Sequence, residues 1–142
     1  MNYDGYILAR PGHYLHKSLR KFMPYSVKVI QPSGNLDSTK SQEFRQKISE
    51  IVETESGAKI VLVDFQEVTF MDSSGLGALV LAFKALRAAD RKLVICSINE
   101  QIRILFELTG MDKVFEIFPN QEEFHQITFS KKSLIKVELD DR

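Results

Sequence analysis

Two adjacent serines, Ser73 and Ser74, follow an apolar segment and precede a glycine-containing helix start in the run Asp72-Ser73-Ser74-Gly75-Leu76-Gly77. The first turn of a helix carries unpaired backbone N–H groups and the positive end of the helix dipole, so an anion there is stabilised at close range. A serine at such a position can cap the helix, accept a phosphate, or do both. The residue types and their spacing therefore predict a position that holds a phosphate or a protein partner.

Each residue of this run also has a purely structural interpretation. Ser73 can be a helix N-cap that does nothing else, and Ser74 can be a first-turn helix residue, although it remains a competing phosphate acceptor. Asp72 can cap or orient the turn, and its charge would oppose a phosphate on Ser73. Gly75 and Gly77 lower helix stability, which indicates the close approach of another backbone or of a partner; tight packing of the helix on the sheet is the alternative for both.

Other residues with catalytic or ligating chemistry do not form a recognisable site. The run Met71-Asp72-Ser73-Ser74-Gly75 is not Gly-x-Ser-x-Gly, and no well-placed histidine base accompanies it, so a serine hydrolase is disfavoured. His13 and His16 have a metal-like spacing but no acid or cysteine beside them. We therefore expect no enzyme activity, no cofactor and no metal. Glycine-rich phosphate loops are absent, but a small-ligand or nucleotide sensor that uses the helix N-terminus remains the alternative function.

Strands alternate with helices along the chain, which predicts βαβ units and the α/β class with a largely parallel sheet. The first helix can be capped by Asp37, Ser38 or Thr39, and Thr39 with Gln42 fits a capping box. Its core stripe is expected to be Phe44, Ile48, Ile51 and Val52, and later helices should bury Leu76, Leu79, Val80, Phe83, Leu86, Ile102, Leu105, Phe106 and Leu108. The predicted strands are Ser26–Ile30, Ile60–Val63, Leu93–Cys96 and Val114–Phe118. The second helix should run from about Ser74 to Ala89, with its alanines keeping the other faces slim for close packing. The third helix should have Asn99 as its cap and Gly110 as its C′ residue, and a short helix should run from Gln121 to Ile127.

Four separated stretches together resemble the STAS domains of bacterial anti-sigma factor antagonists. They are Gly34-Asn35-Leu36-Asp37, Phe70 to Gly77, Leu93 to Cys96, and Leu105 to Phe115, and their order and spacing match that family from about Val27 to Ile127. The resemblance implies a small STAS-like domain with a mixed, mainly parallel sheet packed with helices. We expect a domain over residues 27–127, an N-terminal extension over 1–26 and a C-terminal extension over 128–142.

The resemblance also implies a function. Ser73 would be phosphorylated by a partner kinase, and the unmodified protein would bind a kinase-type anti-sigma factor, with a serine phosphatase reversing the modification. The matching aspartate, Asp37, would lie near the serine on a partner-binding surface made of Asp37, Asp72, Ser73, Ser74, Gly75, Leu76 and Gly77.

Composition supports a single globular domain of this kind and excludes some partners. Of the 142 residues, 44% are hydrophobic and 27% charged, and the formal net charge is zero, so no whole-molecule attraction to nucleic acid or to a membrane is expected. The basic, aromatic segment before Pro24 would bind nucleic acid only weakly. Cys96 lies in an apolar run, which indicates a buried thiol in a reducing compartment. Without a signal-peptide pattern at the start, a cytoplasmic location is expected.

The two ends of the chain give weaker patterns. Tyr6 to Ala9 can form a short strand, and the rest of the segment before Pro24 is expected to be mostly loop. Leu134 to Leu139 alternates like an edge strand that could pair with the N-terminal strand.

Overall fold

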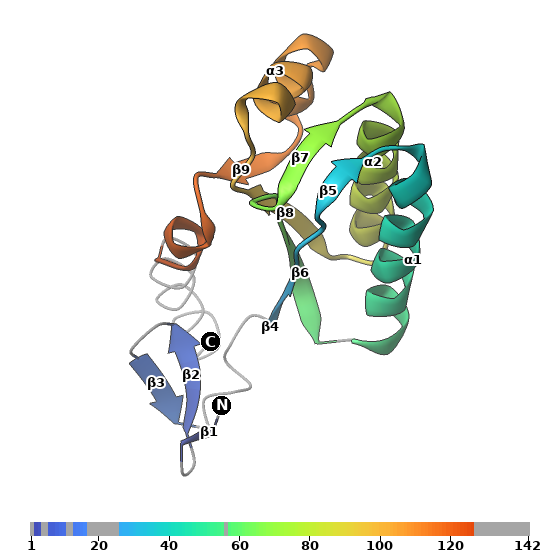
Figure 1. The fold of residues 1–142 in the computed structure, drawn as a ribbon. Helices are drawn as coiled ribbons and strands as arrows, with labels where there is room; N and C mark the ends of the chain where they lie inside the picture. The colour runs from blue at the N-terminus through green and yellow to red at the C-terminus, as the bar shows by residue number, and fades with distance from the viewer. Residues whose placement is uncertain (1, 4–5, 11–12, 17–25, 56, 127–142) are drawn as a thin grey trace.

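The computed structural model describes residues 2–3, 6–10, 13–16, 26–55 and 57–126 (Figure 1). Its centre is a four-stranded parallel sheet in the order β4-β6-β8-β9, and a second parallel pair, β5-β7, lies beside the helices. The strands are β4 (Ser26–Ile30), β5 (Gly34–Leu36), β6 (Ala58–Asp64), β7 (Val68–Met71), β8 (Lys92–Cys96) and β9 (Glu116–Phe118). The helices are α1 (Ser38–Thr54), α2 (Ser73–Ala88), α3 (Glu100–Thr109), the 3₁₀ turn η2 (Met111–Lys113) and a helix over residues 121–126.

The antiparallel pairs of the described residues belong to a separate N-terminal sheet of β1 (Asn2–Tyr3), β2 (Tyr6–Arg10) and β3 (His13–His16). The predicted α/β class with a mixed, mainly parallel set of strands is therefore confirmed. The strand expected at Tyr6 to Ala9 is present, but the expectation of loop around it was wrong for β1 and β3. Local alternation is too short in these strands to be seen without their pairing.

The central strands are apolar on both faces because both faces are covered. On β6, Val61 and Val63 belong to the main core with α1 and α2, whereas Ile60 and Leu62 face a second cluster that contains Phe118 and Phe124. Figure 1 shows α1 and α2 together on one side of the sheet, with the helix over residues 121–126 on the other. This arrangement explains the continuous apolar run that predicted a strand buried on both faces.

Helices α1 and α2 pack against each other through small residues and are fixed at one end by a buried arginine contact. Ala78 and Ala82 of α2 are buried, which agrees with the close packing expected from its alanines. After α2, the Arg91 guanidinium donates to three carbonyl oxygens at the end of α1: Ile51 at 3.0 Å, Val52 at 2.9 Å and Glu55 at 3.1 Å. The guanidinium thus adds side-chain donors to the last turn of α1, where the Ile51 carbonyl also accepts from the Glu55 N–H at 3.0 Å.

Several predicted boundaries were wrong. Strands β5 and β7 were not predicted as separate strands, because three or four residues are too few to show periodicity. The last strand begins at Glu116 rather than Val114, after the turn η2. Leu108, expected in the core, is 81% exposed. Residues 134–139, and with them the proposed edge strand, lie outside the described residues.

The N-terminal turn of α2 approaches β5 at backbone distance. A Cβ placed on Gly75 would lie 2.0 Å from the Leu36 carbonyl oxygen, whereas a Cβ on Gly77 would meet nothing within 4 Å. The two glycines therefore have different structural roles. Packing of the helix on the strand requires Gly75, and nothing within the described fold requires Gly77.

We predict opposite effects for alanine at the two positions. Gly75→Ala should destabilise the fold by about 1–3 kcal/mol or more, because the Leu36 backbone cannot move aside without breaking the β5–β7 pair. Gly77→Ala should stabilise it by about 0.5–1 kcal/mol, because alanine is the better helix former. Urea unfolding followed by circular dichroism measures both, and equal stability of the two variants would contradict the assigned packing role.

Candidate functional site

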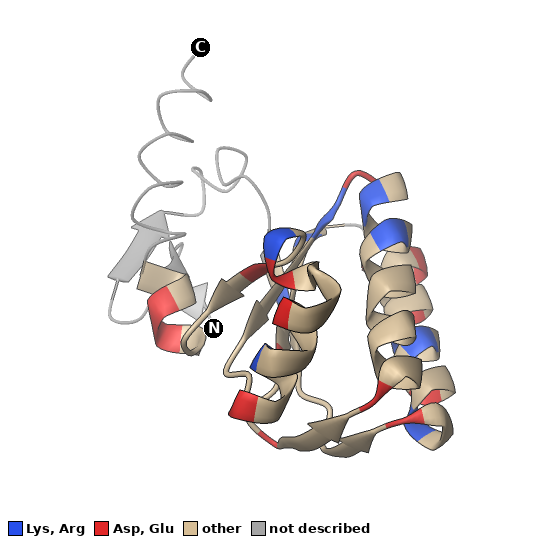
Figure 2. Cartoon of the chain, turned by 90° about the horizontal axis from the view of Figure 1, so that it is seen from above, with Lys and Arg blue, Asp and Glu red and all other residues tan. Residues whose placement is uncertain are grey.

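Two helix N-termini start side by side at one end of the β5–β7 pair. The strands are parallel and in a register that places Leu36 opposite Met71, so the next residues, Asp37 and Asp72, lead into α1 and α2. Figure 2 shows acidic positions where these strands run into the helices. The structure thus brings the Asp37 and Ser73 regions together, as expected for connections at the carboxyl ends of parallel strands.

Asp37 caps α1. Its Oδ1 accepts hydrogen bonds from the Thr39 backbone N–H at 3.0 Å and from the Thr39 hydroxyl at 2.6 Å. The Thr39 hydroxyl bond is the main cause that lowers the pKa of the Asp37 carboxyl, so this side chain is ionised at neutral pH. Of the three predicted caps, Asp37 is therefore the correct one, and the capping box based on Thr39 and Gln42 was wrong.

Asp72, rather than Ser73, caps α2. The Asp72 Oδ1 accepts from the backbone N–H groups of Ser74 at 2.9 Å and Gly75 at 3.0 Å. A carboxylate at this position also interacts favourably with the helix dipole, which a neutral hydroxyl does less well. The interpretation of Ser73 as the N-cap was wrong. Ser73 is the first residue of the helix, it is exposed, and no hydrogen bond of its hydroxyl occurs within the described residues.

The rest of the predicted surface divides between the outside of α2 and its buried side. Ser74 and Gly77 are exposed, whereas Gly75 and Leu76 are buried, Leu76 at 9% exposure. Ser41 links the two helix starts, because its hydroxyl oxygen lies 2.6 Å from the Asp37 carbonyl and 3.2 Å from the Ser74 carbonyl. Asp37, Asp72, Ser73, Ser74 and Gly77 therefore reach a common solvent-facing region, while Gly75 and Leu76 support it from below.

Two amides at the start of α3 hold β7, the strand that leads to Ser73. The Gln101 side chain accepts from the Met71 N–H at 2.9 Å and donates to the Met71 carbonyl at 2.8 Å, which reproduces the pairing of a neighbouring strand. Asn99 caps α3 as predicted, with its Oδ1 2.9 Å from the Ile102 nitrogen, and its Nδ2 also donates to the Thr69 carbonyl at 3.1 Å. Sequence reasoning missed Gln101, because nothing local indicates a bond to a strand 30 residues away.

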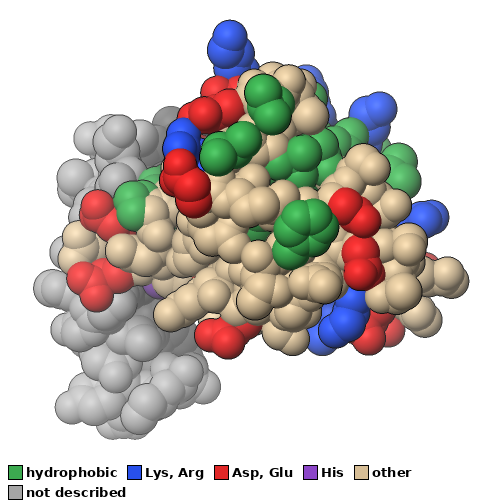
Figure 3. Space-filling view, turned by 45° about the horizontal axis from the view of Figure 1, so that its top comes forward, with side chains coloured by type: hydrophobic (Ala, Val, Ile, Leu, Met, Phe, Trp, Pro, Cys, Tyr) green, Lys and Arg blue, Asp and Glu red, His purple; other side chains and the backbone are tan. Residues whose placement is uncertain are grey.

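Large apolar side chains are exposed on β7, which leads to Ser73, and on α3. Phe70 on β7 is 43% exposed, and Ile104 and Leu108 on α3 are 43% and 81% exposed. Figure 3 shows separate hydrophobic side chains on one face of the molecule, with acidic side chains between them. Exposed apolar side chains mark an interaction surface where they form one large contiguous patch, whereas single ones are ordinary on a protein surface. The sequence placed Leu108 in the core, so this surface was not predicted.

A buried carboxylate, Asp64, is the last residue of β6. It is 1% exposed, and its Oδ2 accepts from the Gln31 and Gln121 amides, each at 2.7 Å, while its Oδ1 accepts from the Gln66 N–H at 3.0 Å. Burial acts to raise the pKa of the Asp64 carboxyl, but these hydrogen bonds outweigh it and the net pKa is lowered. The carboxylate ties the helix over residues 121–126 to the sheet, which sequence reasoning did not anticipate.

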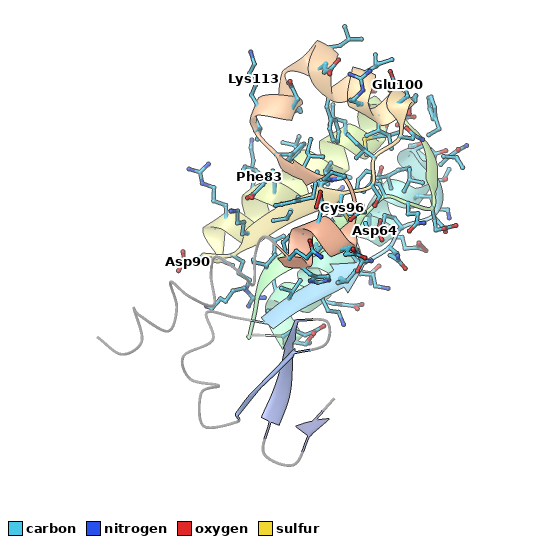
Figure 4. The ribbon with its side chains drawn as sticks, turned by 90° about the vertical axis from the view of Figure 1, so that its left-hand side faces the viewer. Asp64, Phe83, Asp90, Cys96, Glu100 and Lys113 are labelled. Atoms are coloured by element: carbon cyan, nitrogen blue, oxygen red, sulfur yellow. The ribbon has the colours of Figure 1, made fainter. Side chains whose placement is uncertain are left out.

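Cys96 lies next to Asp64 on the neighbouring strand, as the labelled side chains of Figure 4 show. It is fully buried, and burial raises the pKa of its thiol to about 11. The predicted burial of this thiol is confirmed. Within the described residues no group of three or more His, Cys, Asp or Glu side chains is arranged to hold a metal ion, and no helix is long and apolar enough to cross a membrane.

The arrangement of capped helix starts and strands matches a known family. The STAS domain model matches residues 23–124. The chain belongs to the STAS domain family. This confirms the resemblance drawn from the four sequence stretches, and the match includes both caps, both serines and α3.

Several relatives of this STAS domain are named anti-sigma factor antagonists. It is 33% identical over 85 residues to the anti-sigma-B factor antagonist of Listeria monocytogenes, covering 60% of this chain and 73% of the relative. An anti-sigma factor antagonist from Mycobacterium paratuberculosis superposes with a TM-score of 0.59 at 26% identity, covering 66% and 78% of the two chains. The phosphorylated form of the Bacillus cell fate determinant SpoIIAA shares the fold, with a TM-score of 0.56 at 23% identity and coverage of 71% and 90%.

The lowered pKa of Asp64 predicts a specific pH dependence. A carboxyl whose pKa is lower in the folded than in the unfolded state adds stability above the unfolded value of about 3.9, and this is lost as pH falls through the folded pKa. Wild type should therefore exceed Asp64→Asn by about 1–3 kcal/mol at pH 7, with the difference shrinking below about pH 4. Urea unfolding of both proteins from pH 7 to pH 3 measures this, and a difference that stays constant with pH would show that Asp64 does not act through its charge.

Proposed function

We propose that this STAS domain is a cytoplasmic anti-sigma factor antagonist whose binding to its anti-sigma partner is controlled by phosphorylation of Ser73. The proposal rests on the exposure of Ser73 and on its hydroxyl having no role in the cap of α2. Ser73 is exposed at the first position of α2 and its hydroxyl makes no hydrogen bond within the described residues, because Asp72 already performs the capping. A kinase can therefore phosphorylate this hydroxyl without breaking any described contact of the fold.

The relatives support the same function. Two of them are named anti-sigma factor antagonists, and SpoIIAA, which shares the fold, has been solved in a phosphorylated form. We propose a serine kinase of the anti-sigma type as partner and a serine phosphatase that resets the switch. In this proposal the domain is the binding protein, and the catalysis belongs to the partner kinase and the phosphatase.

The partner-binding surface would comprise Asp37, Asp72, Ser73, Ser74 and Gly77, with Gly75 and Leu76 shaping it from inside. Gly77 leaves the α2 surface open, since a Cβ there would meet nothing within 4 Å, so a partner backbone can approach closely. The exposed Phe70, Ile104 and Leu108 extend this surface with apolar area that a partner would remove from water. The unmodified protein would thus offer a partner both apolar area and the polar groups of the two helix starts.

A phosphate on Ser73 would change this surface in two ways. It brings about −1.5 to −2 charges at neutral pH, close to the Asp37 and Asp72 carboxylates, and the partner would have to accommodate or desolvate all of them. The N-terminus of α2 offsets part of the added charge within the domain itself, so the folded protein tolerates the phosphate. The cost therefore falls on the complex rather than on the fold, which is the direction a release switch needs.

We predict that Ser73 is the phosphorylated residue. Incubation with an anti-sigma kinase and labelled ATP should label wild type and Ser74→Ala but not Ser73→Ala, while circular dichroism shows the same fold for all three. Ser73 contributes no cap, so its replacement should cost well under the roughly 1 kcal/mol of a lost cap. Labelling that persists in Ser73→Ala and disappears in Ser74→Ala would move the site to the second serine.

We also predict that phosphorylation weakens partner binding. Calorimetry with stoichiometrically phosphorylated protein should give a lower affinity for the anti-sigma partner than unmodified protein, and Ser73→Ala should bind whether or not kinase and ATP are present. Ser73→Asp should weaken binding less than phosphate does, because it carries less charge and bulk. Equal or tighter binding of the phosphorylated protein would overturn the proposed direction of the switch.

A further inference from the structure

A second potential binding site lies where the chain leaves β4 and turns into β5, against one face of α1. The structure has a cavity of about 140 Å³ there. Its lining comes from the end of β4, the connection to β5, and four α1 residues spaced one turn apart: Ile30, Gln31, Pro32, Ser33, Leu36, Lys40, Glu43, Phe44 and Lys47. The Ser73 hydroxyl is not part of it, so this cavity is a feature that the proposed switch does not use.

The inner wall of the cavity is apolar. Ile30, Leu36 and Phe44 line it and are buried, at 5%, 2% and 5% exposure, so each presents only a small area to the cavity, and the partly exposed Pro32 adds a further apolar surface. An apolar cavity of about 150 Å³ is known to hold one benzene molecule, so this volume suits a body about the size of one aromatic ring. The Gln31 amide, which also lines the cavity, is committed to Asp64 and is fixed in place by that bond.

The outer border of the cavity is charged. Lys40, Glu43 and Lys47 are exposed and lie at i, i+3 and i+7 of α1, so they share one face of the helix. Neither lysine forms an ion pair within the described residues, although Glu43 stands one turn from each. Two ammonium groups against one carboxylate leave an excess of positive charge beside an apolar wall. A group that complements both features has an apolar end and an anionic end.

We infer that this cavity binds a small amphipathic anion, a carboxylate or phosphate monoester attached to an apolar body about the size of a single ring. The body would lie against Ile30, Leu36 and Phe44, and the anionic group would pair with Lys40 or Lys47. The inference does not depend on the Ser73 switch. A ligand in this cavity would nevertheless lie near the proposed switch, because the carbonyl of Leu36, which lines the cavity, accepts from the N–H of Asp72, the cap of α2, at 3.4 Å.

Titration of the ¹⁵N-labelled full chain with benzoate, followed by ¹H–¹⁵N NMR, tests this site directly. Benzoate and phenyl phosphate should produce saturable shifts of the Ser33, Lys40 and Phe44 amide signals, and their relative affinities identify the preferred anionic group. Benzamide, which has the same ring and no charge, should bind at least severalfold more weakly. No saturable shift of these signals, or equal binding of benzamide, would overturn the inference.

Charge variants on the cavity border give a test with opposite expected signs. Lys40→Gln and Lys47→Gln should each weaken benzoate binding about two- to fivefold, the range of an exposed ion pair. Glu43→Gln should strengthen it by a similar factor, because it removes the competing carboxylate. Lys84→Gln, an exposed α2 position outside the cavity lining, is the matched control and should leave the affinity unchanged. Identical affinities across the series would exclude charge recognition by this face of α1.

Discussion

Backbone contact between α2 and β5 governs the arrangement of this domain. The Leu36 carbonyl oxygen would lie only 2.0 Å from a Cβ on Gly75, so no side chain separates the first turn of the helix from the strand. That approach is possible because β5 pairs in parallel with β7, with Leu36 opposite Met71. The same register makes Asp37 and Asp72 the next residues of their strands, so α1 and α2 must begin side by side. The shared position of the caps, the serines and the Ser41 bridge follows from this single constraint.

At the start of α2 one residue caps the helix and its neighbour carries an exposed hydroxyl, which suits the proposed switch. The Asp72 carboxylate satisfies the N–H groups of Ser74 and Gly75, and a cap of this kind contributes about 1 kcal/mol. Ser73 is thereby released from any structural duty and presents its hydroxyl to solvent. If Ser73 were the cap, modification would remove a bond that the fold needs. Here the cap and the proposed phosphorylation site are different side chains, so one can change without the other.

Side-chain amides and one guanidinium stabilise the parts of the fold that regular pairing leaves incomplete. Gln101 pairs with both backbone groups of Met71, Arg91 binds the final carbonyls of α1, and Gln31 and Gln121 surround the Asp64 carboxylate. Each bond joins segments that are distant in the chain and buries a polar group with a partner, which is the condition for burying it at low cost. The platform around Ser73 is therefore held from α3 as well as from its own strands.

The sequence by itself determined the features that depend on local chemistry. The periodicity of Phe44, Ile48 and Ile51, the cap at Asn99, the buried strand at Ile60 to Val63 and the serine-bearing helix start all follow from neighbouring residues, and the α/β class follows from their order. Only the tertiary structure decided which aspartate or serine is the cap, that Gly75 packs while Gly77 is open, and that Leu108 faces solvent. It also assembled the Asp64 cluster and the cavity beside α1. The Gly75 contact with Leu36 and the Asp64 cluster join segments more than 30 residues apart, so no local pattern of residues encodes them. The choice of cap is local, but it depends on where β5 and β7 end, which their pairing sets.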